Sequence, residues 1–395
     1  MSLSEVLPGA AVTNAALAAR FGLHEQWLGA TTGNRTRHFC RPDSPEGVPS
    51  TTSDLAVAVG AQALRNGGFT AADIDFVVLS TASPDHLMPA TVNLVADRLG
   101  IDGVPTFQLT SGCAGALQAL YTARALLGDG GGGLRRGLVV GGDTCVKMLP
   151  NDSDPRSLRP AEMINFAMFG DGAGAAVVEA VDVSPGEGLV VEQMFLRTHG
   201  HGRKGAQTVR WYGVDGAPQV RGPRGTTARE SMAEEDYKAI EANVPGLAAG
   251  VLAELVGLTG WHLAQVEHVL VPQLNGVMTE KIREHLGVRP DQAVSCVAET
   301  GNNGNALPFV QLHRAAERFA TAAPGERVLV ANIESSKWTV AGLALRLEGP
   351  VAVGAADGGA ALDAAALDAA LNAAALDAAA VNPAALDAAL PVAGA

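Results

Sequence analysis

The sequence predicts an α/β protein in which strands and helices alternate through two similar halves. Short runs of β-branched and other apolar residues recur along the chain, and each is typical of a buried strand. Stretches with apolar residues at helical spacing separate these runs, and glycine-rich connections follow the strands. Hydrophobic residues make up 47% of the 395 residues and charged residues 17%, which favours a folded core and excludes a disordered chain.

The first half, residues 1–182, begins its regular alternation with a helix over 53–67. Ser53 is its N-cap candidate, Asp54 suits the first turn, and Gly67-Gly68 stops the helix. The remaining elements expected in this half are strands at 75–80, 105–109, 137–142 and 173–179, and a helix at 114–127.

The second half, residues 183–349, repeats the alternation. We expect a mostly helical stretch over 230–256, interrupted near Pro245 because proline lacks the amide hydrogen that a helix needs. The other elements expected here are strands at 189–196, 266–271, 327–333 and 341–347, and helices at 276–286 and 306–321.

Residues 350–395 form a low-complexity tail rich in alanine and aspartate. The segment 351–395 holds five Asp and no Lys or Arg, and Ala-Leu-Asp recurs along it. Its leucines are spaced so that they do not line one face of a helix. Two interpretations stay open: a weakly helical or disordered appendage, or a docking segment for a partner protein.

Composition narrows the function classes and the compartment. A net charge of −13 argues against binding along a nucleic-acid backbone. The N-terminus does not resemble a signal peptide, and no apolar run reaches the length of a membrane helix. We therefore expect a cytoplasmic protein without a membrane, metal or cofactor partner. Its cysteines lack the spacing of a zinc site or disulfide framework: Cys40, Cys113, Cys145 and Cys296.

Cys113 is the first candidate for chemistry. It stands in Thr110-Ser-Gly-Cys-Ala-Gly-Ala, between a predicted strand and a predicted helix. The N-terminus of a helix favours a thiolate, and its free amides can hold an oxyanion. The small neighbouring residues leave room for a thioester. The alternative is a buried structural cysteine.

Two glycine-rich segments are further candidates. Phe169-Gly-Asp-Gly-Ala-Gly-Ala precedes a strand, whereas dinucleotide and phosphate loops require a helix, so those interpretations are excluded. We expect this segment to allow close backbone packing near a site. Glu299-Thr-Gly-Asn-Asn-Gly-Asn leads into a helix and, taken alone, indicates a turn.

Together these motifs resemble the ketoacyl-ACP synthase III family of the thiolase superfamily, from about Val6 to Leu347. The segment around Trp27, the loop from Ser80 to Thr91, the Cys113 turn and the segment from Phe169 all match in order. Val271-Pro272 and Gly301-Asn302 stand where two further catalytic segments begin. The resemblance implies a duplicated αβαβα fold, a homodimer and a thioester on Cys113. Substrate contacts are expected at Trp27, Met88, Gly304 and Ser336.

The departures from the family are informative. Gln273 occupies the position of the family's catalytic His, while Asn302 is retained. In a condensing enzyme this His and Asn stabilise the enolate that forms when a malonyl thioester loses carbon dioxide. A glutamine donates hydrogen bonds but cannot act as a base near neutral pH. Thr31 replaces an Arg that helps to hold coenzyme A, which favours a carrier-protein thioester.

The loop that follows the strand over 189–196 offers a base that could replace the family's catalytic His. His199 and His201 form a His-Gly-His pair there and are the candidates, and the alternative interpretation is a solvated basic loop. His268 is interpreted as a core residue. Glu334 stands where the family is usually glycine-rich, and it is either a carboxylate that orients a base or a surface charge.

Three functions follow from these residues. The leading one is transfer of an acyl group from a carrier-protein or coenzyme A thioester, through acyl-Cys113, to a hydroxyl or amine of a small natural-product acceptor. His199 or His201 would take the proton, and Asn302 or Gln273 would polarise the carbonyl. The alternatives are decarboxylative condensation with malonyl-ACP and a catalytically silent docking partner.

Overall fold

A computed structural model describes residues 1–128, 132–150, 157–180, 182, 188–211, 216–221, 225–319 and 322–353. Two sheets organise these residues. The first sheet contains, in order, β16 (Ala352–Val353), β1 (Ser2–Val6), β7 (Gly172–Glu179), β6 (Arg136–Asp143), β4 (Phe76–Ser80) and β5 (Thr106–Leu109). The second contains β13 (His268–Leu270), β14 (Arg327–Glu334), β15 (Thr339–Leu347) and β8 (Leu189–Thr198).

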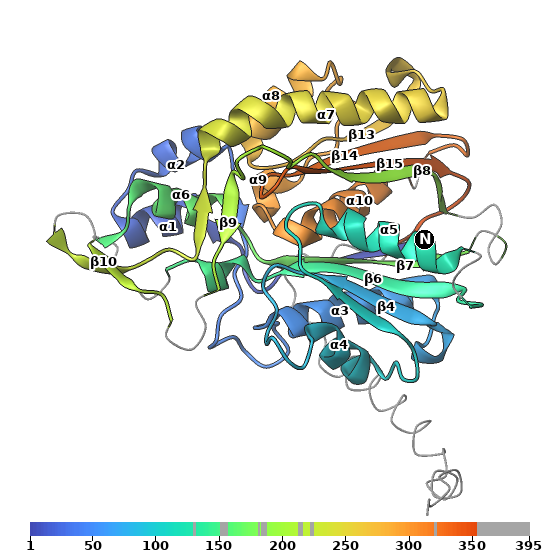
Figure 1. Cartoon of the computed structure of the whole chain (residues 1–395), viewed down its shortest axis with the longest axis horizontal. Helices are drawn as coiled ribbons and strands as arrows, with labels where there is room; N and C mark the ends of the chain where they lie inside the picture. The colour runs from blue at the N-terminus through green and yellow to red at the C-terminus, as the bar shows by residue number, and fades with distance from the viewer. Residues whose placement is uncertain are drawn as a thin grey trace, which may run out of the picture.

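Helices fill three layers around these sheets (Figure 1). Helices α5 (Gly115–Leu127) and α10 (Leu307–Phe319) lie between the sheets. Helices α3 (Thr52–Gly67) and α4 (Thr91–Leu99) cover the outer face of the first sheet, and α7 (Tyr237–Thr259) and α8 (Gly276–His285) cover that of the second. The layers therefore run αβαβα, which confirms the predicted fold class.

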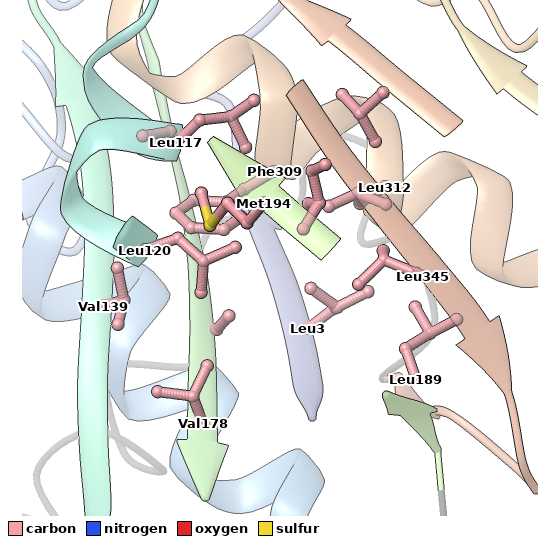
Figure 2. Close-up of a cluster of buried hydrophobic side chains, with 14 of the residues drawn as sticks. Leu3, Leu117, Leu120, Val139, Val178, Leu189, Met194, Phe309, Leu312 and Leu345 are labelled. Atoms are coloured by element: carbon pink, nitrogen blue, oxygen red, sulfur yellow. The ribbon is translucent and has the colours of Figure 1, made fainter. Parts of the chain in front are cut away.

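The apolar pattern of the central elements explains why the layers hold together. Leu117 and Leu120 of α5 and Phe309 of α10 meet Val139 of β6 and Leu345 of β15 in one buried cluster between the sheets (Figure 2). Each large side chain buried in this way contributes roughly 1.5–3 kcal/mol. The helix that follows Cys113 is thus fixed on both of its faces.

The N-cap of α3 lies two positions before the predicted Ser53, whereas the helix ends at the predicted Gly67-Gly68. Thr51 is the N-cap: its hydroxyl accepts a hydrogen bond from the Asp54 amide, and the Asp54 carboxylate accepts one from the Thr51 amide. Gly68 ends the helix with φ 71°, a conformation that favours glycine. The Ser53 amide donates instead to the Asp85 carboxylate.

The stretch over 230–256 differs from its prediction. Its first residues belong to β12 (Ala233–Glu235), which pairs with β9 (Gln207–Val209). Asp236 then caps α7, which runs through Pro245 without interruption because its apolar face packs on β14 and β15. By length and composition α7 is the one helix of the described residues that could cross a membrane.

The remaining elements surround the edges of the layers. Strand β16 pairs with β1, so the start of the predicted tail joins the first sheet, while residues 354–395 lie outside the described part of the chain. The other helices and strands are β2 (Val12–Thr13), α1 (Asn14–Phe21), α2 (Glu25–Thr32), β3 (Thr36–Arg37), α6 (Pro160–Met168), β10 (Gln219–Arg221), β11 (Thr227–Arg229) and α9 (Val297–Thr300).

Candidate active site

Cys113 lies in the turn that joins β5 to α5. The helix begins at Gly115, whose amide donates a hydrogen bond to the Gly112 carbonyl at 2.8 Å, and so closes the turn around the cysteine. Cys113 is partly exposed, whereas Cys40, Cys145 and Cys296 are buried. It is therefore the cysteine that a substrate can reach.

Asn305, from the second half of the chain, holds this turn. Its Nδ2 donates to the Ser111 carbonyl and to Oδ2 of Asp143, both at 2.7 Å, and its Oδ1 accepts from the Ser80 hydroxyl at 2.6 Å. A Cβ on Gly115 would overlap the Asn305 amide and the Ser80 hydroxyl. A glycine at position 115, two residues after Cys113, is thus required by the close approach of Asn305.

Two cavities meet at Cys113. The larger, of about 360 Å³, extends toward the β9–β12 pair, and its size is that of a small-molecule site. The smaller, of about 30 Å³, extends toward Asn302 and Gln273 and has room for about one water-sized group. The residues that line both cavities are Cys113, Phe169, Gln207 and Glu235.

Asn302 and Gln273 both line the smaller cavity, but their side-chain amides differ in how many hydrogen bonds they make. Asn302 accepts a hydrogen bond from the Gly304 amide on Oδ1 at 3.1 Å, so its Nδ2 is the donor end. Gln273 accepts from the amides of Cys296 and Val297, both at 2.9 Å. Its Nε2 donates to the Val294 carbonyl at 2.9 Å. Gln273 therefore fixes the start of α9, the helix that leads into Asn302.

The surroundings of Cys113 disfavour its thiolate. Burial, together with the carboxylates of Glu334 and Asp143, raises the pKa of the thiol to about 12. These effects outweigh the stabilisation of the thiolate that was expected from the N-terminus of the helix. Attack by Cys113 therefore needs a base that removes the proton as the new bond forms.

The predicted substrate residues divide into two groups. Gly304 and Ser336 line the larger cavity. Trp27 on α2 is 41% exposed and Met88 is 88% exposed, and neither is among the described residues that line the two cavities. Leu87, the neighbour of Met88, does reach the larger one.

The two histidines predicted as bases lie apart from the cysteine. His199 and His201 follow β8 and are exposed, and neither is found among the described lining residues of either cavity. The backbone of His199 donates to the Trp338 carbonyl. His268, interpreted as a core residue, is buried and interacts with Glu326 at 2.9 Å.

Glu334 is part of the site and not a surface charge. It is 8% exposed, and its Oε2 accepts from the Ser111 hydroxyl at 2.7 Å and from the Gly112 amide at 2.9 Å. The hydroxyl of Ser336 donates to Oε1. Three donors thus hold the carboxylate in place beside the nucleophile turn.

Sequence reasoning missed Asn305, Asp143 and Glu235. Asn305 belongs to the asparagine-rich turn that begins at Glu299, but local spacing does not reveal its distant partners Ser80, Ser111 and Asp143. Asp143 follows a predicted strand, which is a signal for a site residue. Glu235 was placed in a helix, where its acidic neighbours suit the first turn, and this concealed its position opposite Gln207. In the described part of the chain no three His, Cys, Asp or Glu side chains are grouped as metal ligands.

A five-layer fold with a reachable cysteine between strand and central helix is the architecture of thiolase-like enzymes. Residues 107–198 match 3-oxoacyl-[acyl-carrier-protein] synthase III, and residues 258–346 match the C-terminal part of that family. The chain belongs to the 3-oxoacyl-[acyl-carrier-protein] synthase III family.

Relatives and solved structures support this assignment over most of the chain. Beta-ketoacyl-[acyl-carrier-protein] synthase III 3 of Streptomyces coelicolor is 32% identical over 335 residues, which are 83% of this chain and 91% of that protein. The structure of AbyA1, a tetronic acid condensing enzyme, is 46% identical with a TM-score of 0.77, covering 87% of this chain and 98% of AbyA1. The synthase III of Pseudomonas aeruginosa is 26% identical with a TM-score of 0.73, covering 89% and 98%.

Proposed function

We propose that this protein is an acyltransferase of the synthase III family that carries its acyl group on Cys113. It would take the group from a carrier-protein or coenzyme A thioester and deliver it to a hydroxyl or amine of a small acceptor in secondary metabolism. Asn305 and Glu334 preset the nucleophile turn for this chemistry, and the 360 Å³ cavity offers space for the acyl chain.

One observation favours acyl transfer over decarboxylative condensation. Gln273 stands where the family has its catalytic histidine, and three backbone groups engage both ends of its amide. It is therefore a positioning residue for the segment of Asn302 and not a group that carries a proton. The retained Cys113 in its braced turn favours catalysis over a silent docking role.

The donor is proposed to be a carrier-protein thioester. Thr31 replaces the arginine that would meet coenzyme A, and two nearby arginines do not compensate. Arg37 is fully buried, and its guanidinium donates to the carbonyls of Val12 and Ala167 and to the side chain of Asn14. Arg35 is at the surface, paired with Glu299.

Similarity to AbyA1 favours a hydroxyl acceptor. A tetronic acid is a five-membered lactone with a second carbonyl function, so joining two acyl chains into it requires one ester bond and one carbon–carbon bond. An oxygen attack on a 3-oxoacyl group would form the ester. The methylene between two carbonyls is acidic enough to form the carbon–carbon bond without loss of carbon dioxide. Such a route needs no histidine at position 273.

The acyl-transfer steps balance without an added oxidant or reductant. Cys113 Sγ attacks the donor thioester, the acyl carbon–sulfur bond of the donor breaks, and the donor leaves as a thiol. The acceptor oxygen then attacks acyl-Cys113, the bond to Sγ breaks, and the hydroxyl proton returns to the sulfur. Backbone amides of the nucleophile turn and Nδ2 of Asn302 would stabilise the oxyanions.

A homodimer is part of the proposal. Strand β5 ends the first sheet, and among the described strands none pairs with its outer side. Phe107 on β5 is 36% exposed and Tyr121 on α5 is 43% exposed, and unpaired edges with apolar side chains favour association. We place the enzyme in the cytoplasm.

Intact mass measurement tests the proposed function. The protein is incubated with a 3-oxoacyl carrier protein, and the acyl mass is expected on the wild type but not on Cys113→Ala. A 2-hydroxyacyl thioester is then expected to remove this mass without release of carbon dioxide. Carbon dioxide release from malonyl carrier protein in step with product would favour the condensing alternative. A wild type that never gains mass would favour the silent docking partner.

A further inference from the structure

Glu235 is the carboxylate on the wall shared by the two cavities at Cys113. It ends β12, directly before the capping residue of α7, and faces Gln207 across the β9–β12 pair. Gln207 and Cys113 share that wall with it. No other carboxylate among the described residues lines both cavities.

The carboxylates of Asp143, Glu235 and Glu334 lie around Cys113, and they differ in the hydrogen bonds that they accept. Asp143 accepts from five donors, among them the Asn305 and Ala82 amides, and Glu334 accepts from three. The Glu235 carboxylate meets side chains only: Asn165 Nδ2 at 3.0 Å and Gln207 Nε2 at the longer distance of 3.5 Å, with Tyr237 beside it. Asp143 and Glu334 therefore accept backbone amides of the site, while Glu235 accepts from side chains at the cavity.

We propose that Glu235 is the general base of this enzyme, which moves the proton between Cys113 and the substrates in both half-reactions. This inference rests on the proposed acyl transfer. During loading Glu235 takes the Cys113 proton as the sulfur attacks and gives it to the departing thiol. During transfer it takes the acceptor's hydroxyl proton and gives it to Sγ as the thioester breaks.

Charge and burial suit Glu235 to this role. Desolvation raises the pKa of Glu235, and the charge of Glu234 contributes. The pKa is thereby shifted in the direction of neutral pH, and a general base is most effective when its pKa lies near the working pH. Cys113, with its pKa of about 12, requires such a partner both to attack and to leave. The ionisable groups that line the two cavities with Glu235 are Cys113, Asp143, Cys145, Arg210, Tyr237 and Glu334. Those that line a further cavity with it are Arg159, Glu162, Lys204, Glu234 and Asp236.

The test compares Glu235→Gln with Glu241→Gln. Glutamine keeps the size of Glu235 and can accept one of its two hydrogen bonds, but it cannot accept the proton. Glu241 on α7 is exposed, pairs with Lys281 at 2.8 Å and lines neither of the two cavities in the described structure, so it is the matched control. Loading of Cys113 by 3-oxoacyl carrier protein and its discharge by a 2-hydroxyacyl thioester are timed separately by intact mass between pH 5 and 9.

Both rates are expected to fall about 100-fold or more in Glu235→Gln at pH 7, and the pH dependence that titration of Glu235 gives to the wild-type rates is expected to disappear. Glu241→Gln should stay within about threefold of the wild type. Removal of the Glu235 charge also lowers the pKa of Cys113, so its alkylation by iodoacetamide should become faster. Slower transfer with faster alkylation distinguishes a lost base from a disturbed site, which would slow both.

The outcomes separate this inference from the proposed function. Normal loading and discharge by Glu235→Gln, with an unchanged pH profile, would overturn the role of Glu235 alone. Loss of transfer together with slower alkylation would assign Glu235 a structural role and also overturn the inference. A wild type that never loads Cys113 would overturn the proposed function and this inference with it.

Discussion

The carboxylate of Glu334 accepts a hydrogen bond from the backbone amide of Gly112 at 2.9 Å, one residue before the nucleophile. Glu334 ends β14 in the second half of the chain, and Gly112 belongs to the turn after β5 in the first half. The contact joins the two halves at Cys113. It positions the turn, while its negative charge opposes the thiolate.

Glu334→Gln is therefore expected to increase the reactivity of Cys113 toward iodoacetamide. Glutamine can still accept from Gly112, but the negative charge that raises the pKa of Cys113 is gone. A fall of half to one pKa unit increases the thiolate fraction about three- to tenfold at pH 8. The alkylation rate is followed by intact mass. Glu326→Gln, just before the other end of β14, is the control, and an equal or slower rate in Glu334→Gln would contradict the prediction.

Gly115→Ala is expected to damage both stability and loading. The added methyl would overlap the Asn305 amide and the Ser80 hydroxyl, so the hydrogen bonds that hold the Cys113 turn must break. We expect a loss of about 1–3 kcal/mol in the free energy of unfolding and at least tenfold slower acyl loading. Denaturant unfolding and intact mass measure these two effects.

Gly250→Ala in α7 is the matched control for this substitution. A Cβ at Gly250 meets no atom within 4 Å among the described residues, and alanine is the better helix former. The variant should gain about 0.5–1 kcal/mol and load normally. Equal effects of the two substitutions would show that helix propensity, and not the Asn305 contact, decides the outcome at Gly115.

Phe107→Asp is expected to convert the proposed dimer into monomers. A charge on the exposed edge strand β5 would have to be buried without a partner in the dimer, which costs several kcal/mol. Sedimentation velocity measures the change. Val220→Asp, at an exposed position of β10, should leave the oligomeric state unchanged. A wild type that sediments as a monomer would refute the dimer itself.

Asp171 is expected to make the protein less stable as the pH rises. Burial raises its pKa to about 7, although the amides of Val146 and Cys40 donate to the carboxylate. Between about pH 4 and 7 the folded state therefore holds a proton that the unfolded chain has lost, so the free energy of unfolding falls with pH across this window. The decrease is on the order of 2–4 kcal/mol.

Asp171→Asn removes this titration. The variant should be less stable at pH 5, because its amide accepts from only one of the two backbone donors, and its stability should depend less on pH between 5 and 8. Denaturant midpoints at several pH values measure the slope. An equally steep decline in the wild type and Asp171→Asn would assign the pH dependence to other groups.

Most of the fold could be predicted from the sequence because its signals are local. The strand, glycine turn and alanine-rich helix around Cys113 lie within some twenty consecutive residues, and observed bounds differ from the predicted ones by about one residue. The same reasoning failed over 230–256. The acidic residues before Tyr237 suit a helix start, but pairing of β12 with the distant β9 extended them as a strand.

By itself the sequence determined the fold class and the family, and it singled out Cys113 as the candidate nucleophile and Gln273 at the position of the family's histidine, because each depends on neighbouring residues or on motif order. Only the tertiary structure decided the surroundings of that cysteine. It brought Asn305 and Glu334 onto the nucleophile turn, placed Glu235 on the cavity wall and left His199 and His201 outside. These contacts join residues more than a hundred positions apart, and the packing of the layers, not local spacing, fixes them.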